Sequence, residues 1–205
     1  MSAPLTLLAL QGALARGEAP SAEEVASALR APAAPPPAAP PPAAPPPAAP
    51  ALHVTCAPSG VGKSAWVARA HPGAAVVCMD DLRLALTGRA EDQSRNREVF
   101  ALALERLRGH LARGEEAVWD ATSLTRAHRA PLLALGEGAG ARVRLEVLVA
   151  PLDRALRGNL ARARQVPEEV IRAQYARWEL PARDEAGEVV YLVPDPSRPW
   201  GWRAL

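Results

Sequence analysis

Lysine is almost absent from this chain of 205 residues. The chain contains 24 basic residues, and Lys63 is the only lysine among them. Aromatic residues are also scarce, with one Phe, two Tyr and five Trp. A core must therefore be built mainly from Leu, Val and Ala. The same shortage leaves few rings on which the bases of a single-stranded nucleic acid could stack.

Cysteine is limited to Cys56 and Cys78, which both lie in apolar runs typical of strands. We expect buried, reduced thiols that act as small hydrophobic groups rather than a disulfide. Long hydrophobic runs are absent as well, since no stretch approaches the ~18 apolar residues of a membrane span. The N-terminus also lacks the basic region of a secretory signal. These absences predict a cytoplasmic protein.

Neither sign of charge dominates the sequence. The formal net charge of +2 is too small to indicate nucleic-acid binding by itself. The distribution is more informative, because arginines cluster between Arg126 and Arg177. This cluster could present a local basic face to a phosphorylated partner.

Proline is concentrated in one segment, residues 31–50, which is nearly pure Ala and Pro. Proline fixes φ and removes an N–H donor, so we expect a semi-rigid polyproline linker there. Residues 1–30 precede it and contain Ser21-Ala22-Glu23-Glu24, which resembles a capped helix start. We expect a helical or disordered segment that could dock on a protein partner. Residues 51–205 then form one full-sized domain.

Strand and helix patterns alternate throughout this domain. Short apolar runs predict five strands, and stretches with helical spacing predict the helices between them. The expected strands are 52–56, 74–79, 117–119, 143–149 and 189–193, and the expected helices are 63–70, 82–86, 91–113, 125–135, 152–161 and 168–178. Repeated β-α-β order predicts an α/β fold with a mostly parallel sheet flanked by helices. The ligand should lie beyond the carboxyl ends of the strands.

The first expected strand leads into a phosphate-binding loop. A strand, a tight glycine-containing loop and Gly-Lys-Ser at the start of a helix form the P-loop arrangement. Lys63 would reach the β- and γ-phosphates of ATP, and Ser64 would ligate Mg²⁺. The helix dipole and backbone N–H groups would hold the phosphates. The expected ATP-binding residues are Ser59, Gly60, Val61, Gly62, Lys63 and Ser64.

The usual first glycine of the P-loop pattern is Ala57 in this chain. A chance Gly-Lys-Ser turn is the alternative interpretation. Two observations favour the phosphate loop: a strand precedes it and a helix follows it, and Lys63 is the single lysine of an arginine-rich chain. A compact ammonium on a flexible stem suits a phosphate-contacting position.

Asp80 and Asp81 follow the second expected strand, at the same edge of the sheet as the loop. A carboxylate there can accept the proton of an attacking hydroxyl group, which makes Asp80 a candidate general base. An Asp pair can equally cap the next helix. Arg83 lies three residues after Asp80 and could hold a phosphate of the acceptor.

Two more segments carry candidate site residues. Asp120 ends the third expected strand and, with Thr122, could orient the acceptor, although Thr122 or Ser123 could instead cap a helix. Residues 159–164 join two helices and are rich in arginine, so they could form a lid over the γ-phosphate. By contrast, we interpret Arg126 and Arg129 on the intervening helix as a solvent-facing pair.

With these motifs in this order, the chain resembles the kinase domain of polynucleotide 5′-hydroxyl kinases, as in phage and bacterial end-healing enzymes. The resemblance covers residues 51–195. It rests on a phosphate loop with an early proline, on Asp80-Asp81-Leu82-Arg83, on Asp120-Ala121-Thr122-Ser123, and on a lid sequence in residues 158–171.

The resemblance implies roles for five residues. Asp80 is implied to be the general base on a polynucleotide 5′-hydroxyl, and Arg83 to grip the adjacent 3′-phosphate. Asp120 and Thr122 are implied to support the acceptor, and Arg162 to contact the transferring phosphate.

This chain departs from the family pattern at three positions. Gly158 stands where the family has Arg, Ser123 replaces Asn, and Ala65 replaces a common Thr. The phosphatase motifs that often accompany this kinase domain do not occur, so we expect a kinase domain alone.

The sequence leaves the acceptor open. It predicts an ATP- and Mg²⁺-dependent kinase of the 5′-hydroxyl ends of RNA or DNA. A kinase of a small hydroxyl acceptor, such as a nucleoside, sugar, antibiotic or nucleotide-sugar, has the same loop, carboxylate and lid. In a third alternative, the domain is a nucleotide-binding subunit tethered to a partner through residues 1–50.

Overall fold

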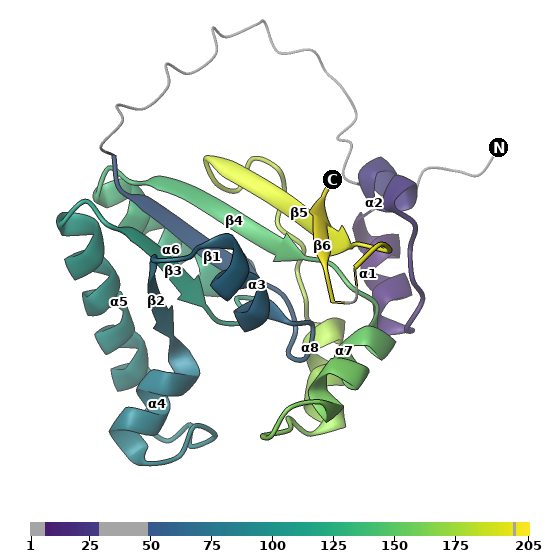
Figure 1. Cartoon of the computed structure of the whole chain (residues 1–205), viewed down its shortest axis with the longest axis horizontal. Coiled ribbons are helices and arrows are strands. Elements are labelled where there is room, and N and C mark those ends of the chain that lie inside the picture. The colour runs from purple at the N-terminus through teal and green to yellow at the C-terminus, as the bar shows by residue number, and fades with distance from the viewer. Residues whose placement is uncertain (1–6, 29–48, 199) are drawn as a thin grey trace, which may run out of the picture.

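The domain is built on one six-stranded sheet, seen in the computed structural model of Figure 1. The structure describes residues 7–28, 49–198 and 200–205, so most of the expected Ala/Pro linker lies outside the described residues. The strand order is β2-β3-β1-β4-β5-β6; only β6 is antiparallel to its neighbour. The strands are β1 Ala51–Cys56, β2 Ala75–Cys78, β3 Glu116–Asp120, β4 Arg142–Leu148, β5 Glu188–Pro194 and β6 Trp202–Ala204. The predicted α/β fold is confirmed.

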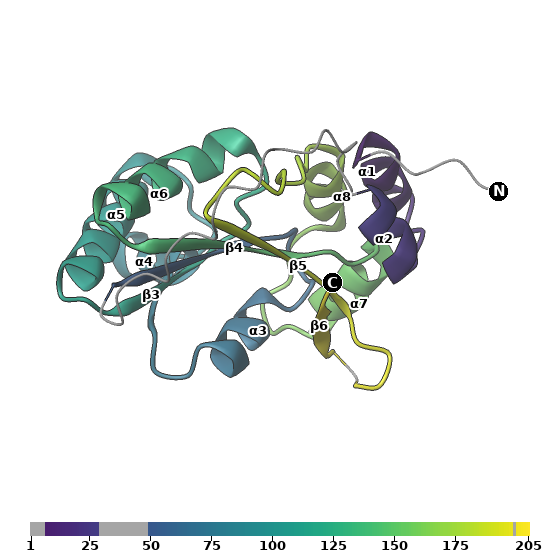
Figure 2. The same ribbon diagram turned by 90° about the horizontal axis from the view of Figure 1, so that it is seen from above.

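Helices cover both faces of this sheet. Figure 2 shows α5 and α6 on one face and α3 on the other. The helices are α1 Leu7–Ala15, α2 Ala22–Ala28, α3 Lys63–Ala70, α4 Met79–Thr87, α5 Asn96–Ala112, α6 Arg126–Gly138, α7 Leu152–Leu160 and α8 Glu168–Ala176. No helix among the described residues is long and apolar enough to cross a membrane.

The core follows from the alternation of side chains along β1. Leu52 and Val54 are fully buried beneath α5 and α6, where they pack with Leu107 and Leu132. Between them, His53 points to the opposite face, which α3 covers. One face of the central strand is therefore apolar, and the other carries polar side chains.

The N-terminal segment packs on the rest of the domain. Ser21 and Glu24 form a reciprocal cap at the start of α2: the Ser21 N–H donates to Glu24 Oε2 (2.7 Å), and the Glu24 N–H donates to Ser21 Oγ (3.2 Å). Leu14 and Val25 are buried in the same cluster as Tyr175 of α8. The described part of this segment is thus attached to α8 through apolar contacts.

Both cysteines are free, as predicted. Cys56 is fully buried, and Cys78 is half-buried. Burial raises the pKa of both thiols, which makes them poor nucleophiles at neutral pH.

The interpretation of Arg129 as solvent-facing was wrong. Its side chain is 1% exposed and lies against Glu185, with distances of 2.5 Å from Nε to Oε1 and 3.0 Å from Nη2 to Oε2. Its Nη1 also donates to the carbonyl oxygens of Ser123 and Glu179 at 3.0 Å. Burial acts to lower the pKa of Arg129, but the Glu185 carboxylate raises it overall. Arg129 is a structural ion-pair partner that holds the chain after β3.

We expect Glu185→Ala to lower the free energy of unfolding by about 3–5 kcal/mol, because it leaves a buried guanidinium unpaired. Chemical denaturation of the purified protein measures this loss. The matched control is Glu168→Ala, which removes an exposed pair with Arg172 and should cost at most about 0.5 kcal/mol. Equal effects of the two substitutions would contradict the role of the buried pair.

Candidate functional site

The phosphate loop, residues 57–64, connects β1 to α3 at the carboxyl edge of the sheet. Gly60 and Gly62 have φ values of 83° and 102°, a region that favours glycine. Gly62 is the N-cap of α3, so the free N–H groups of the first helical turn are directed toward the loop. Ala57 is buried, has no positive φ, and donates its N–H to Thr122 O at 3.0 Å. This geometry explains why the position needs no glycine.

Lys63 is the first residue of α3, and its ammonium reaches back to the loop, where it donates to Pro58 O at 2.9 Å. Desolvation lowers the pKa of Lys63 to about 8; the Asp120 carboxylate opposes this shift, and the Arg162 guanidinium adds to it. A bound triphosphate would supply the negative charge that favours the protonated amine.

The lowered pKa of Lys63 predicts how the affinity for ATP depends on pH. The affinity for ATP should be level up to about pH 8 and then fall, approaching tenfold per pH unit, because binding the triphosphate requires the protonated amine. Isothermal titration at several pH values measures this slope and the accompanying proton uptake. Lys63→Arg keeps its charge and should give a flat profile. A flat wild-type profile between about pH 8 and 9.5 would contradict this role of Lys63.

Helix α7, which leads into the lid, packs directly against the phosphate loop. A side chain at Gly158 would place its Cβ 2.1 Å from Gly60 O, and one at Gly60 would lie 2.1 Å from Ala155 O. The backbones of α7 and the loop are therefore in contact, and an arginine cannot stand at position 158 in this packing. The Asn159 side chain then closes the following turn: its Nδ2 donates to Val166 O (2.7 Å), and its Oδ1 accepts from Val166 N (2.9 Å).

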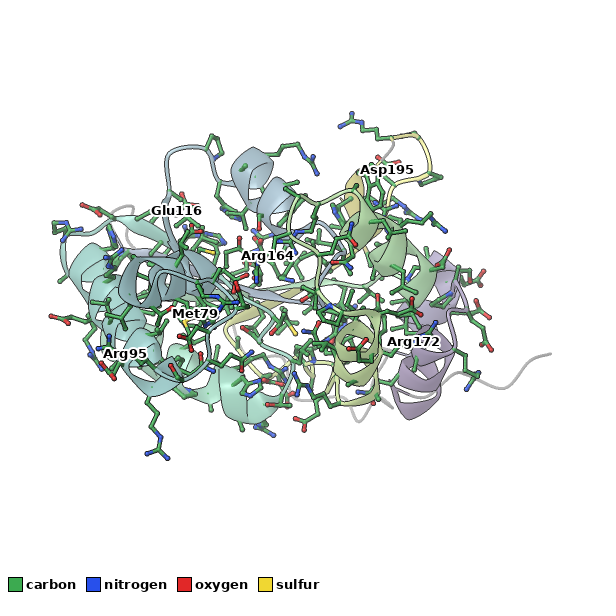
Figure 3. The ribbon with its side chains drawn as sticks, turned by 90° about the horizontal axis from the view of Figure 1, so that it is seen from below. Met79, Arg95, Glu116, Arg164, Arg172 and Asp195 are labelled. Carbon is green, nitrogen blue, oxygen red and sulfur yellow. The ribbon has the colours of Figure 1, made fainter. Side chains whose placement is uncertain are left out.

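Asp80 lies at the junction between β2 and α4. The strand ends at Cys78, so Asp80 belongs to the first turn of the helix rather than to the end of the strand as predicted. Its Oδ1 accepts from Arg83 Nη1 (2.6 Å), and its Oδ2 accepts from Arg164 Nη2 (2.5 Å). Arg164 belongs to the lid and lies near Met79 at the start of α4 in Figure 3. The lid thus contacts Asp80 through Arg164, which the sequence did not single out; the contact predicted for Arg162 was with the transferring phosphate.

Arg83 is nearly buried and held by the protein itself. Its Nε donates to Asn96 Oδ1 (3.1 Å), and its Nη1 donates to Ala90 O (2.9 Å) as well as to Asp80. Asn96 also borders a surface hollow of about 600 Å³, which is lined by residues 93–98. The Arg83 side chain is therefore hydrogen-bonded both to Asp80 and to Asn96 at the rim of this hollow.

The third strand brings a second carboxylate to the loop. Asp120, the last residue of β3, is almost buried, and its charge acts on Lys63. Ser64 and Asp120 are oxygen donors that could hold Mg²⁺ there. Thr122 contacts the loop through its carbonyl group, as the acceptor for Ala57 N. Ser123 adopts a left-handed conformation (φ 45°), which asparagine tolerates better, and its Oγ accepts from Trp119 Nε1 at 3.0 Å.

Gln174 was missed by sequence reasoning. It lies on α8, is almost buried, and its Oε1 accepts from the Ser59 N–H at 2.7 Å. This bond fixes the start of the phosphate loop to a helix 115 residues further along the chain. No local pattern in the sequence marks such a contact.

Fold and site together define a P-loop kinase-like nucleotide-binding domain. A phosphate loop follows β1, a carboxylate follows β2, and an arginine-bearing lid follows β4, all at one edge of a parallel sheet. Residues 52–181, more than half of the chain, match the family described as AAA domain, and the chain belongs to that family.

Several solved structures share this fold. A gluconokinase from Sinorhizobium meliloti 1021 is 21% identical, with 74% of this chain and 86% of that one covered and a TM-score of 0.50. A chain of the Pnkp1/Rnl/Hen1 RNA repair complex is 16% identical, with coverages of 62% and 43% and a TM-score of 0.56. The AvrRxo1-ORF1:-ORF2 structure with ATP contains a chain that is 16% identical, with coverages of 76% and 57% and a TM-score of 0.53.

This chain spans about half the length of the latter two chains. Identities this low show a shared fold and leave the acceptor undetermined. No curated protein matches the sequence.

Proposed function

We propose that this domain is an ATP- and Mg²⁺-dependent kinase that transfers the γ-phosphate to the 5′-hydroxyl end of RNA or DNA, with Asp80 as the general base. The position of Asp80 carries the proposal. Its carboxylate is oriented by the nearly buried Arg83, contacted by the lid residue Arg164, and lies at the same sheet edge as Lys63.

Each part of the site has a role in this reaction. Residues 59–64 bind the phosphates of ATP, and Ser64 ligates Mg²⁺. Lys63 and Arg162 lie on the transferring phosphate, where they neutralise the charge on its equatorial oxygens. The acceptor hydroxyl gives its proton to Asp80 as its oxygen attacks the γ-phosphorus and ADP leaves.

The acceptor hydroxyl must share Asp80 with the arginines. Arg83 is nearly buried and makes two further hydrogen bonds, so it stays in place. Arg164 is exposed and belongs to the lid, so its contact with Oδ2 is the one that an acceptor can displace. We therefore place the attacking hydroxyl at Oδ2, beneath the lid.

A polynucleotide end fits the surroundings of Asp80. Arg83 joins Asp80 to Asn96, which borders the hollow lined by residues 93–98. Arg95 in this lining is paired with Glu98, so we place the phosphate next to the 5′-hydroxyl at Arg97. The fold shared with a chain of an RNA repair complex supports this acceptor.

A small hydroxyl acceptor is the second candidate. The structural match covers 86% of the gluconokinase chain, so nearly the whole of that enzyme corresponds to this domain. Among the described residues, the exposed large hydrophobic side chains include one aromatic ring, that of Trp200, which gives little surface for base stacking.

Transfer of a radiolabelled γ-phosphate from ATP separates the two candidates. The acceptors are a 5′-hydroxyl RNA, the matching DNA, the same oligonucleotides with a 5′-phosphate, and a panel of sugars, nucleosides and aminoglycosides. We expect label on the 5′-hydroxyl oligonucleotides and none on their 5′-phosphorylated forms. Label on small acceptors alone would contradict the polynucleotide proposal and favour the second candidate.

A further inference from the structure

Two histidines and two glutamates meet on the face of the sheet that α3 covers, away from the phosphate loop. His53 comes from the middle of β1, His71 caps the C-terminus of α3, Glu146 comes from β4, and Glu116 begins β3. His53, His71 and Glu146 are 12%, 7% and 2% exposed, whereas Glu116 is 46% exposed. Four segments that are distant in the sequence thus form one polar cluster.

The two carboxylates face opposite sides of the imidazole rings. Glu146 Oε1 lies 3.3 Å from His53 Nδ1 and 2.9 Å from His71 Nε2. Glu116 Oε1 lies 3.3 Å from His53 Nε2 and 2.8 Å from His71 Nδ1. All four ring nitrogens therefore lie within 3.3 Å of a carboxylate oxygen, and three of these contacts are hydrogen bonds, the exception being that of His53 Nε2 with Glu116.

The hydrogen atoms do not suffice for these contacts when the rings are neutral. A neutral imidazole carries one N–H, so two rings supply two hydrogens for four nitrogen–oxygen contacts. In the other two contacts, a nitrogen lone pair faces a carboxylate oxygen. A cation between the two rings and Glu146 would be held by one such lone pair from each ring.

We propose that His53, His71 and Glu146 bind a zinc ion, and that Glu116 orients both imidazoles from the outer side. The ligands are His53 Nδ1, His71 Nε2 and Glu146 Oε1, and candidate ligand atoms of these residues lie within 4.8 Å of one another. Tetrahedral zinc with ligands at about 2.0–2.1 Å separates its ligand atoms by roughly 3.4 Å. The observed 2.9 and 3.3 Å need only a small opening of the cluster.

The surroundings match those of a metal site. With the metal on one nitrogen of each ring, the other nitrogen of each lies near Glu116: His71 Nδ1 is hydrogen-bonded to it at 2.8 Å, and His53 Nε2 is 3.3 Å away. A carboxylate is the usual partner of a metal-bound histidine. The second oxygen of the ligand carboxylate, Glu146 Oε2, accepts from Trp66 Nε1 at 2.7 Å, which leaves Oε1 for the metal.

The charges around the cluster also suit a divalent cation. Glu116 and Glu146 carry two negative charges, which neutral imidazoles do not offset. Arg144 Nε lies 3.8 Å from Glu146 Oε1 and 3.7 Å from Glu188 Oε1, so Arg144 is shared with an exposed carboxylate. Three protein ligands leave a fourth position on the ion for water.

This zinc site is separate from the nucleotide site. His71 follows the last residue of α3, and Ser64 lies in its first turn, about 10 Å away at the usual helical rise. The ion would join the C-terminal end of the phosphate-loop helix to β1 and β4. The proposal does not depend on the proposed phosphotransfer.

Titration of the nucleotide-free protein, residues 1–205, with Zn²⁺ alone, against a chromophoric chelator, tests the site. We expect one equivalent to bind at neutral pH, and His53→Ala and His71→Ala to abolish this binding. Glu116→Gln should weaken it by about 10- to 100-fold, because it removes the shared carboxylate partner. The matched control is His110→Ala, which removes a histidine paired with Glu115 elsewhere and should leave binding unchanged.

Two outcomes would overturn the proposal: no equivalent bound by the wild-type protein, or wild-type affinity in His53→Ala/His71→Ala. Absorption of the Co²⁺-substituted protein gives a second measurement that uses the unchanged chain. We expect visible bands without a thiolate charge-transfer band. A strong thiolate band would assign the ion to Cys56 or Cys78 and would also overturn the proposal.

Discussion

Replacing Lys63 with alanine should lower phosphotransfer by at least about 10³-fold, because it removes the ammonium that neutralises the transferring phosphate. The substitution should not unfold the domain. The folded protein lowers the pKa of Lys63 to about 8, so folding acts against the charged amine at neutral pH. We therefore expect Lys63→Ala to be as stable as the wild type or slightly more so. Single-turnover transfer and chemical denaturation measure the two effects.

The single lysine permits a check without mutation. Reductive methylation can modify only Lys63 and the N-terminal amine of this chain. Saturating ATP should slow modification of Lys63, and mass spectrometry of the peptides reads this protection. Full activity in Lys63→Ala, or equal labelling with and without ATP, would show that the loop does not hold the phosphates as described.

Asp80→Asn should lower the turnover number by about 10²–10⁴-fold, because the amide cannot accept the proton of the attacking hydroxyl. The amide keeps the size and some hydrogen-bonding capacity of the carboxylate, so ATP affinity should change by no more than a few-fold. Steady-state kinetics with varied ATP and varied acceptor separate these effects.

Asp81→Asn is the matched control for this substitution. Asp81 is the neighbouring residue in the first turn of α4, is exposed, and undergoes the same change of charge. We expect nearly wild-type turnover for Asp81→Asn. If both variants lost activity equally, the effect would come from the local charge or from the helix N-terminus, and Asp80 would not be the base.

The sequence predicted the parallel core of the fold because each element there has its own local pattern. The helix of residues 63–70 was placed correctly, since Gly62 and the loop fix its start. The sequence did not predict β6. This strand has three residues and pairs only with β5, so it is too short to show a pattern of its own. The sequence also extended β2 to Met79, because the apolar run continues into the first residue of α4.

The sequence indicated candidate site residues where they lie close together in the chain, as in the phosphate loop and in Asp80 with Arg83. Contacts between distant segments could not be predicted from local patterns in the sequence. Arg164 reaches Asp80 across 84 residues, and Gln174 reaches Ser59 across 115. Arg129 was misread for the same reason, since its partner lies 56 residues away and an arginine on a helix ordinarily faces water.

The most direct test of the account is a crystal structure of the complex with ADP, Mg²⁺ and a 5′-hydroxyl oligonucleotide. The account predicts the β-phosphate on the N–H groups of residues 60–64 with Lys63 turned from Pro58 O to a phosphate oxygen, and the 5′-oxygen within about 2.6–3.2 Å of Asp80. A nucleotide bound outside the loop, or a 5′-hydroxyl held away from Asp80 under a closed lid, would contradict it.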